Sequence, residues 1–283
     1  MSESAPVILG TASQIYALFG DSIEVDSVYG KRGSQLYHTL TLRENAEIGE
    51  MLEAAGEPSG TVLELACGSG RLTFPFLEAG HTVLGLDFSP HMLAHLARRL
   101  AEPEAAAHAD RLTTIEGDMT DFTLDQRFDL ILLAASAVLN VTPELRAKMF
   151  RCVHEHLTET GRFLVTILDF PALEDPDATA FENTAVFPAH DGIAPILCTF
   201  LDYIDPAERI RSTNFVSHTV QDGAVTETVI YTTLTYPLTL SELDEELKAV
   251  GLRVVAQHDV TSGYQVLKAG KYPVRGLLLE ISR

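Results

Sequence analysis

Two glycines follow a short apolar run, at positions where the backbone can approach a ligand closely. The run covers residues 62–65, Gly68 and Gly70 come next, and a helical pattern begins directly after Arg71. Glycine tolerates positive φ angles and carries no side chain to hold a ligand away. The first backbone N–H groups of the helix lack partners within it and point toward the same turn. The pattern predicts a binding site, but by itself it does not identify the ligand.

Three carboxylates end successive predicted strands and narrow the choice of ligand. Glu64 lies just before the turn, Asp87 ends the next strand, and Asp118 follows the third. The 23 residues between Glu64 and Asp87 are about what one βαβ unit provides. A carboxylate at the end of the second strand can accept both hydroxyls of a ribose. The acid after the third strand can accept a hydrogen bond from an adenine amino group, and Met119 can cover the ring.

Dinucleotides and S-adenosylmethionine (SAM) can both occupy such a scaffold, and the turn distinguishes them. The dinucleotide fingerprint G-x-G-x-x-G/A places a pyrophosphate on the helix N-terminus. Here residues 66–71 read A-C-G-S-G-R, and Glu64 precedes them. Glu64 would repel a pyrophosphate but can anchor an ammonium. Because SAM carries an ammonium and no phosphate, the sequence favours SAM, and an NAD-dependent enzyme is a remote alternative.

The elements that must position these residues alternate between short apolar runs and helical patterns. Ser89 and Thr142 are each followed by proline, the pattern of an N-cap with proline at the first helical position. This alternation predicts an α/β fold with a Rossmann-like, doubly wound, mostly parallel sheet. The expected strands are residues 61–65, 82–86, 112–115, 128–133 and 163–168.

The alternation stops after the fifth strand and returns near residue 238. Asp222-Gly223 between two β-like runs predicts a hairpin. Thr239 and Glu242 have the spacing of a capping box at the start of a helix, and Gly251 ends that helix. The β-like runs of the interruption are residues 195–203, 208–220 and 224–236, and the closing strands are residues 254–255 and 276–281.

We therefore predict three parts. Residues 1–60 form an N-terminal cap that is mostly helical, with Gly56 ending its last helix. Residues 61–168 and 238–283 form the SAM-binding Rossmann-like domain. Residues 169–237 form an antiparallel β insertion that serves as a lid over the substrate.

Over residues 61–168 the chain resembles the class I SAM-dependent methyltransferases. The resemblance rests on the segment from Glu64 to Gly70, on Asp87, and on residues 116–119, 128–130 and 157–165. One departure is Ala66, where the family usually has glycine.

The resemblance implies a role for each part of the site. Glu64 and the glycine turn would lie along the methionine part of SAM, Asp87 at the ribose, and Asp118 at the adenine. Ala134 and Ser136 would lie near the sulfonium. The full set of implied cofactor contacts is Glu64, Ala66, Cys67, Gly68, Gly70, Arg71, Asp87, Phe88, Met92, Gly117, Asp118, Met119, Ala134 and Ser136.

The remaining segments resemble those of small-molecule N-methyltransferases, such as those acting on glycine or amino sugars. A fainter likeness is to methyltransferases of the daptide type, which act on a terminal amine of ribosomal peptides. In such relatives an N-terminal tyrosine approaches the methyl-donor end of SAM, which makes Tyr29 and Tyr16 candidates here, although both can be packing residues. His218 is the candidate base, with His190 and His38 as alternatives, and each can instead be structural.

Composition limits the partners. A formal net charge of −20 argues against nucleic-acid binding and can gather cationic amines. The three cysteines form no C-x-x-C pair, so no metal site is expected. No apolar run approaches the roughly 20 residues of a membrane span, and no targeting segment is visible. We expect a cytoplasmic protein without a membrane partner, and a homodimer is compatible with the sequence.

Three cationic side chains can bind an acidic group of a substrate, or can simply be solvated. They are Lys31, Arg32 and Arg43.

Three functions are compatible with these features. The favoured one is a SAM-dependent methyltransferase that N-methylates an amine of a specialised metabolite or a modified peptide. The second is an O- or C-methyltransferase of a small molecule on the same scaffold. The third is a SAM-binding or regulatory protein without catalysis, against which the intact turn and the three acids argue.

Overall fold

The computed structural model describes residues 6–42, 44–261 and 272–283, and the chain forms two compact units. The α/β unit comprises residues 44–170, 238–264 and 274–283. The β unit comprises residues 1–43, 171–237 and 265–273. This division differs from the expected one in two respects. Residues 44–60 belong with the Rossmann-like part, and the N-terminal segment shares one unit with the β insertion.

The α/β unit is built on a seven-stranded sheet in the order β11-β12-β6-β5-β2-β3-β4. The strands from β6 to β4 are parallel, whereas β12 is antiparallel to both of its neighbours. The predicted doubly wound, mostly parallel sheet is therefore confirmed. The strands are β2 (Thr61–Leu65), β3 (Thr82–Asp87), β4 (Leu112–Glu116), β5 (Phe128–Leu133), β6 (Leu157–Asp169), β11 (Arg253–Val260) and β12 (Arg275–Ser282).

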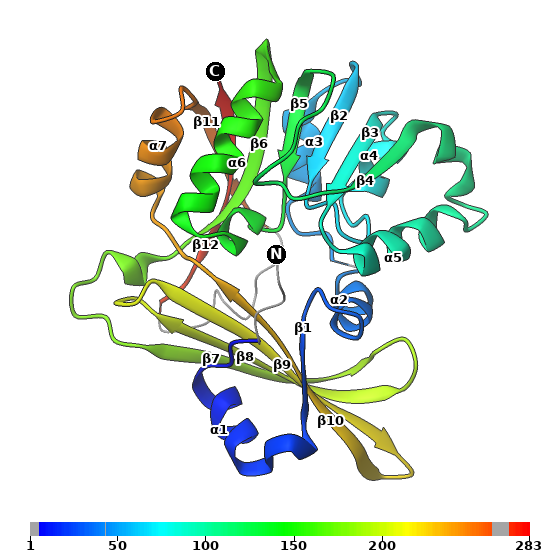
Figure 1. The fold of residues 1–283 in the computed structure, drawn as a ribbon, viewed down its shortest axis with the longest axis vertical. Helices are drawn as coiled ribbons and strands as arrows, with labels where there is room; N and C mark the ends of the chain where they lie inside the picture. The colour runs from blue at the N-terminus through cyan, green and yellow to red at the C-terminus, as the bar shows by residue number, and fades with distance from the viewer. Residues whose placement is uncertain (1–5, 43, 262–271) are drawn as a thin grey trace. The chain divides into compact units, whose positions relative to one another are not determined.

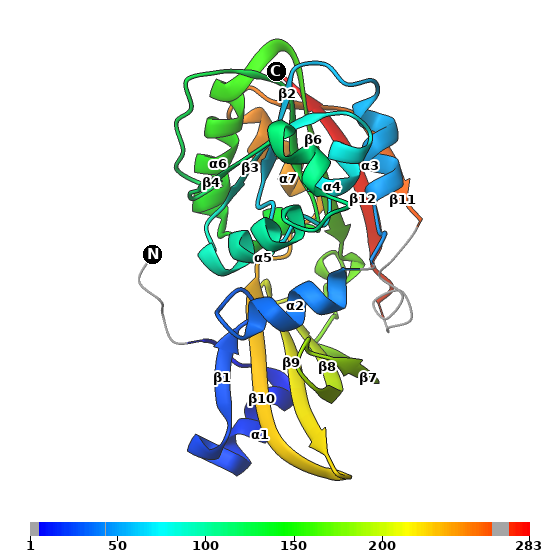
Figure 2. The same ribbon diagram turned by 90° about the vertical axis from the view of Figure 1, so that its right-hand side faces the viewer.

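Helices lie on both faces of this sheet, with α3 and α6 on opposite sides (Figures 1 and 2). The helices are α3 (Ile48–Ala55), α4 (Thr73–Glu78), α5 (Pro90–Leu100), α6 (Pro143–His156) and α7 (Leu240–Lys248). The capping residues predicted at the starts of α5 and α7 form the expected hydrogen bonds. The hydroxyl of Ser89 accepts a hydrogen bond from the Met92 N–H, and Thr239 with Glu242 forms a full capping box.

The central strands are buried on both faces, which explains their unbroken apolar sequence. Leu63 in β2 and Ile131 in β5 are completely buried. Phe76, Phe150 and Phe163 are likewise 0% exposed. At roughly 25 cal/mol per Å² of apolar area removed from water, these side chains supply the main stabilisation of the unit.

The β unit contains a five-stranded sheet in the order β1-β10-β9-β8-β7. Only β1 runs parallel to its neighbour. Asp222 and Gly223 both have positive φ angles (50° and 78°), which confirms the hairpin between β9 and β10. Two strands, β1 and β7, were not expected from the sequence. The strands are β1 (Glu24–Ser27), β7 (Phe181–His190), β8 (Pro195–Asp205), β9 (Ile210–Gln221) and β10 (Ala224–Thr235).

A helix covers each face of this second sheet, as Figures 1 and 2 show. On one face α1 (Gly10–Phe19) packs in a cluster with Val216 and Ile230. On the other face α2 (Gly33–Thr41) packs in a cluster with Cys198 and Tyr231. These are called the α1 face and the α2 face below.

Candidate cofactor site and acceptor residues

The residues predicted to bind SAM lie at one edge of the α/β sheet. Strand β2 pairs with β5 on one side and β3 on the other, and all three are parallel, so their carboxyl ends meet. The direction in which the chain adds strands reverses between β2 and β5. Ligands of open α/β sheets bind at such a switch point.

The turn after β2 adopts the left-handed conformation that its glycines permit. Gly68 and Gly70 have φ angles of 56° and 85°. A Cβ on Gly70 would lie 2.7 Å from the Phe74 ring, so any side chain there would collide. Ala66 also has a positive φ, 53°. For a residue with a Cβ this conformation costs roughly 1–2 kcal/mol, which accounts physically for glycine being usual there.

Asp87 is fixed toward this turn by two backbone groups. The Gly68 N–H donates to its Oδ2 and the Ser89 N–H donates to its Oδ1, both at 2.8 Å. Burial raises the pKa of Asp87, and the two N–H bonds oppose that rise. A carboxylate held in this way keeps further lone pairs for hydroxyl donors, so it fits the two hydroxyls of a ribose.

Glu64 is a buried carboxylate with little to neutralise it. It is 3% exposed, and the Thr73 hydroxyl donates to its Oε2 at 2.6 Å. Burial raises its pKa to about 8; Thr73 and the positive charge of Arg71 oppose the rise, whereas Asp87 adds to it. A cation brought close to Glu64 would favour the charged form. The residue therefore fits the ammonium of SAM.

Asp118 follows β4 and is held by its own loop. Its Oδ1 accepts from both the N–H and the hydroxyl of Thr120, each at 2.8 Å. The Gly117 N–H donates to the backbone oxygen of Asp87 at 2.9 Å, which ties this loop to the end of β3. The acids predicted for ribose and adenine therefore lie on adjoining segments that a backbone hydrogen bond connects.

The loop after β5 contains two consecutive left-handed residues that are not glycine. Ala135 and Ser136 have φ angles of 55° and 54°. The Ala135 N–H donates to Glu47 Oε1 at 2.8 Å. Ser136 is 6% exposed, and its hydroxyl has no hydrogen-bond partner among the residues described. Such strain persists where surrounding contacts over-determine the backbone, which is typical of functional sites.

Residues 62–161 match the protein family described as methyltransferase domain. This stretch contains all three carboxylates and both glycines of the turn. Over these residues the chain is therefore similar to methyltransferase domains.

The similar proteins agree on this domain. The chain is 31% identical over 130 residues to dTDP-3-amino-3,4,6-trideoxy-alpha-D-glucopyranose N,N-dimethyltransferase of Streptomyces venezuelae, covering 45% of this chain and 51% of that one. The match thus spans about half the length of that curated relative. The structure of the glycopeptide N-methyltransferase MtfA complexed with S-adenosyl-L-methionine is 28% identical, with a TM-score of 0.57, and covers 84% of this chain and 92% of that one.

A third similarity concerns the fold alone. The structure of the CcbJ methyltransferase from Streptomyces caelestis has a TM-score of 0.70 at 19% identity and covers 90% of this chain and 98% of that one. Together the matches confirm the predicted fold class and the methyltransferase domain, and the glycopeptide N-methyltransferase of the second match binds SAM.

Glu47 contacts both Arg71 and Ala135, and the sequence analysis did not predict this role. It lies just before α3, is completely buried, has a φ of 63°, and forms an ion pair with Arg71. Arg71 also donates to the Ala46 backbone oxygen at 2.9 Å. The predicted cofactor contact at Arg71 therefore has its guanidinium engaged within the protein. No sequence signal marks Glu47, because its partner Ala135 lies 88 residues away.

Other predicted cofactor contacts differ in exposure. Cys67 is 4% exposed and packs against Gly85, and burial raises the pKa of its thiol. Met92 is 1% exposed, so its side chain lies on the buried face of α5, in the core. Phe88, in contrast, exposes 57% of its surface. These three contacts stay predictions, as do those at Met119 and Ala134.

The three predicted catalytic residues lie in the β unit, and the structure does not bring them together. Tyr16 packs in the cluster on the α1 face, and His218 points to that same face, with its Nδ1 2.9 Å from the Thr228 hydroxyl. Tyr29 packs on the α2 face, where its ring makes an edge contact with Tyr37 at 5.8 Å. Because the sheet separates Tyr16 from Tyr29, at most one of them can act at a given ligand.

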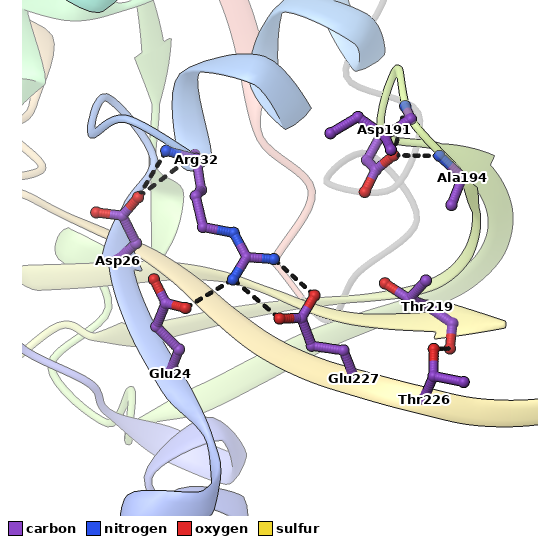
Figure 3. A network of polar contacts seen from close by, with 10 residues as sticks. Glu24, Asp26, Arg32, Asp191, Ala194, Thr219, Thr226 and Glu227 are labelled. Atoms are coloured by element: carbon purple, nitrogen blue, oxygen red, sulfur yellow. Dashed lines mark hydrogen bonds and ion pairs between the residues drawn. The ribbon is translucent and has the colours of Figure 1, made fainter. Parts of the chain in front are cut away.

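Arg32 is part of an ion-pair network, shown in Figure 3. Its guanidinium binds Glu24 and Glu227, both at 2.6 Å, and the bond to Glu227 is the main cause that raises its pKa. Asp26 accepts the N–H groups of Arg32 and Gly33 and so fixes the start of α2. Arg32 therefore connects β1, β10 and α2. Because its guanidinium is already paired with two carboxylates, it is not available to bind an acidic substrate. Arg43 lies outside the described residues.

The described residues contain no group of three or more His, Cys, Asp or Glu side chains that could hold a metal ion. None of the helices in these residues combines the length and apolar character needed to cross a membrane.

Proposed function

We propose that this chain is a cytoplasmic SAM-dependent N-methyltransferase that acts on an amine of a specialised metabolite or a modified peptide. The observation that carries the proposal is the set of Glu64, Asp87 and Asp118 at one sheet edge, within a methyltransferase domain. The choice of an amine is supported by two similar proteins, an amino-sugar N,N-dimethyltransferase and a glycopeptide N-methyltransferase.

The three carboxylates suit one ligand when taken together. Glu64 would bind the ammonium, Asp87 the ribose hydroxyls, and Asp118 the adenine amino group. The cofactor supplies an electrophilic methyl group on a sulfonium. Ser136, whose buried hydroxyl has no partner among the described residues, would lie near that end of the cofactor. The rigid loops that carry these side chains would hold the donor in one orientation, which is the main contribution a protein makes to such a transfer.

The acceptor must arrive as a neutral amine in line with the methyl group. A modest base or a route to water is enough to remove its proton. The net charge of −20 would raise the local concentration of protonated amines around the protein. We expect an amine acceptor and no nucleic acid among its partners, and a homodimer remains compatible with this function.

The test is incubation with SAM labelled on its methyl group, together with a panel of amines and phenols. Label transferred to amines alone supports the proposal. Transfer to phenols or carbon acids would indicate the O- or C-methyltransferase instead. SAM binding in calorimetry without transfer to any acceptor would indicate a non-catalytic SAM-binding protein. Tight binding of NAD without binding of SAM would overturn the cofactor assignment as well.

A further inference from the structure

Glu47 connects two segments that follow neighbouring strands of the α/β sheet. Its Oε1 accepts from the Arg71 guanidinium, directly after the glycine turn of β2, and from the Ala135 N–H in the loop after β5. Strands β2 and β5 are parallel, and Leu65 is aligned with Leu133, so both segments leave the sheet at its carboxyl edge. A single carboxylate oxygen therefore links the two loops beside which the cofactor is expected.

The Arg71 guanidinium is held in place from the segment that precedes α3. It pairs with Glu47 and donates to the Ala46 backbone oxygen at 2.9 Å. Glu47 is 0% exposed, and the Arg71 side chain is 14% exposed. The Glu47 backbone oxygen accepts from the Met51 N–H at 2.8 Å, which ties the residue to the first turn of α3. The ion pair is therefore shielded from water and anchored to a helix.

This ion pair is a poor device for stabilising the fold. Glu47 has a φ of 63°, a conformation that is strained for any residue with a Cβ. Removing two charges from water also costs free energy, and their mutual attraction often regains no more than that cost. Strained residues of this kind cluster at functional sites. We therefore looked for a role in what the pair does to the residues around it.

A second carboxylate, Glu64, lies within electrostatic range of the same guanidinium. The positive charge of Arg71 opposes the rise in the pKa of Glu64 that burial causes. Glu64 is nevertheless bonded to the Thr73 hydroxyl, while Arg71 is paired with Glu47. An arginine bound to Glu64 would compete with the SAM ammonium, because both are cationic donors for one acceptor. The direction in which Arg71 points thus decides whether Glu64 is available.

We propose that Glu47 is a positioning residue of the cofactor site, which holds the Arg71 guanidinium beside the start of α3 and so keeps Glu64 available for the ammonium of SAM. The Ala135 N–H binds the same oxygen and fixes the Glu47 carboxylate in this orientation. This inference rests on the proposed function, and it concerns a residue that acts through Arg71 rather than on the ligand.

Loss of the Glu47 charge should release Arg71 toward Glu64. An amide at position 47 can still accept a hydrogen bond, but it supplies no counter-charge to a guanidinium that is mostly buried. Glu64 would then become its ion-pair partner, since an unpaired buried charge is strongly unfavourable. The SAM ammonium would lose its acceptor, whereas the ribose and the adenine would keep theirs at Asp87 and Asp118.

Calorimetry with two ligands and the full chain tests this role. SAM carries the ammonium, and methylthioadenosine has the same ribose and adenine without it. In Glu47→Gln the Kd for SAM should rise at least about tenfold, and that for methylthioadenosine should stay within about twofold of the wild type. Glu246→Gln is the matched control, because it removes the charged partner of Arg146, another buried arginine of this unit, and should change neither Kd. Equal weakening of both ligands in Glu47→Gln would overturn the proposal.

A double variant separates the released arginine from the loss of Glu47 itself. Glu47→Gln with Arg71→Met removes both charges of the pair, so it should fold even if Glu47→Gln alone does not. Its Kd for SAM should lie within about threefold of the wild type. A double variant that binds SAM at least about tenfold more weakly than the wild type would refute the positioning role but leave the methyltransferase assignment intact. A wild type that binds neither ligand would overturn the proposed function as well.

Discussion

The two sheets hold their carboxylates in different ways. In the α/β unit Asp87 lies at the end of a strand, and backbone N–H groups fix it. In the β unit Asp202 lies within a strand, and the side chains of Arg211 and Thr213 fix it. A carboxylate held by the backbone depends only on local chain geometry. One held by side chains depends on strand register and on each partner residue, so a single substitution can leave it without compensation.

The largest expected effect is on the side-chain-held carboxylate. Arg211→Met should lower the free energy of unfolding by about 3–5 kcal/mol, because it removes the ion-pair partner of the buried Asp202 carboxylate. The matched change Arg32→Met removes an arginine whose side chain is 36% exposed, and we expect a loss of about 1 kcal/mol or less. Urea unfolding measures both values. Equal losses would show that Asp202 does not depend on its arginine.

The backbone-held carboxylate should matter for ligand binding more than for stability. Asp87→Ala should weaken SAM binding about 100-fold, because it removes the charged acceptor proposed for two hydroxyl groups. The change Asp110→Asn, at an exposed position of the same unit, serves as control and should leave Kd unchanged. Isothermal calorimetry gives both constants. A Kd for Asp87→Ala close to that of the wild type would remove this residue from the cofactor site.

Glu64 should make SAM binding depend on pH. Its pKa of about 8 means that it is mostly protonated at pH 7, whereas the SAM ammonium would favour the charged form. Binding should therefore release a proton, and affinity should rise with pH, by at most about tenfold per unit, until it levels off above about pH 8. Calorimetry in two buffers of different ionisation enthalpy measures how many protons are released when SAM binds. Glu64→Gln should abolish the release; proton release that persists in this variant would assign it to another group.

The same pKa has the opposite consequence for stability. Between about pH 4.5 and pH 8 the folded, cofactor-free protein keeps a proton that the unfolded chain has lost. Stability contributed by this group is therefore complete at low pH and decreases as pH rises through that window. In Glu64→Gln, this part of the pH dependence of urea unfolding should disappear.

The smallest expected effect concerns the backbone of the turn. Ala66→Gly should raise the free energy of unfolding by up to about 1 kcal/mol, since glycine adopts a φ of 53° without strain. The same exchange at the exposed helical position Ala97 should lower it by about 1 kcal/mol. Thermal unfolding compares the two variants. A loss of stability in both would mean that the turn carries no conformational strain.

The sequence predicted the α/β unit well because its signals are local. Proline after a capping residue places the starts of α5 and α6, and the apolar runs place β2 to β6. The acids at the strand ends follow from the same spacing. Ala134 and Ser136 were predicted only as neighbours of the sulfonium. The left-handed backbone of Ala135 and Ser136 was not predicted, because it has no local cause. It depends on Glu47, which only the folded chain brings near.

The β unit was harder to predict because its order depends on pairing between distant strands. Strand β1 has four residues and a polar sequence, so it has little intrinsic β signal and forms by pairing with β10. The alignment of Asn183 in β7 with Thr233 in β10 could not be predicted either, since it depends on the register of three strand pairs. Tyr16 and Tyr29 likewise appear equivalent in the sequence, and only the fold assigns them to opposite faces.

The parallel pairing of β1 with β10 also sets the order of events during biosynthesis. Glu24 pairs with Val229, so a segment near the start of the nascent chain waits for one made about two hundred residues later. At roughly 5–20 residues per second the ribosome takes about 10–40 s to supply that partner. During this interval the strands β2 to β6 are complete and can begin to fold, whereas β1 has no template. We therefore expect chaperones to protect the unpaired β1 segment until β10 has been synthesised.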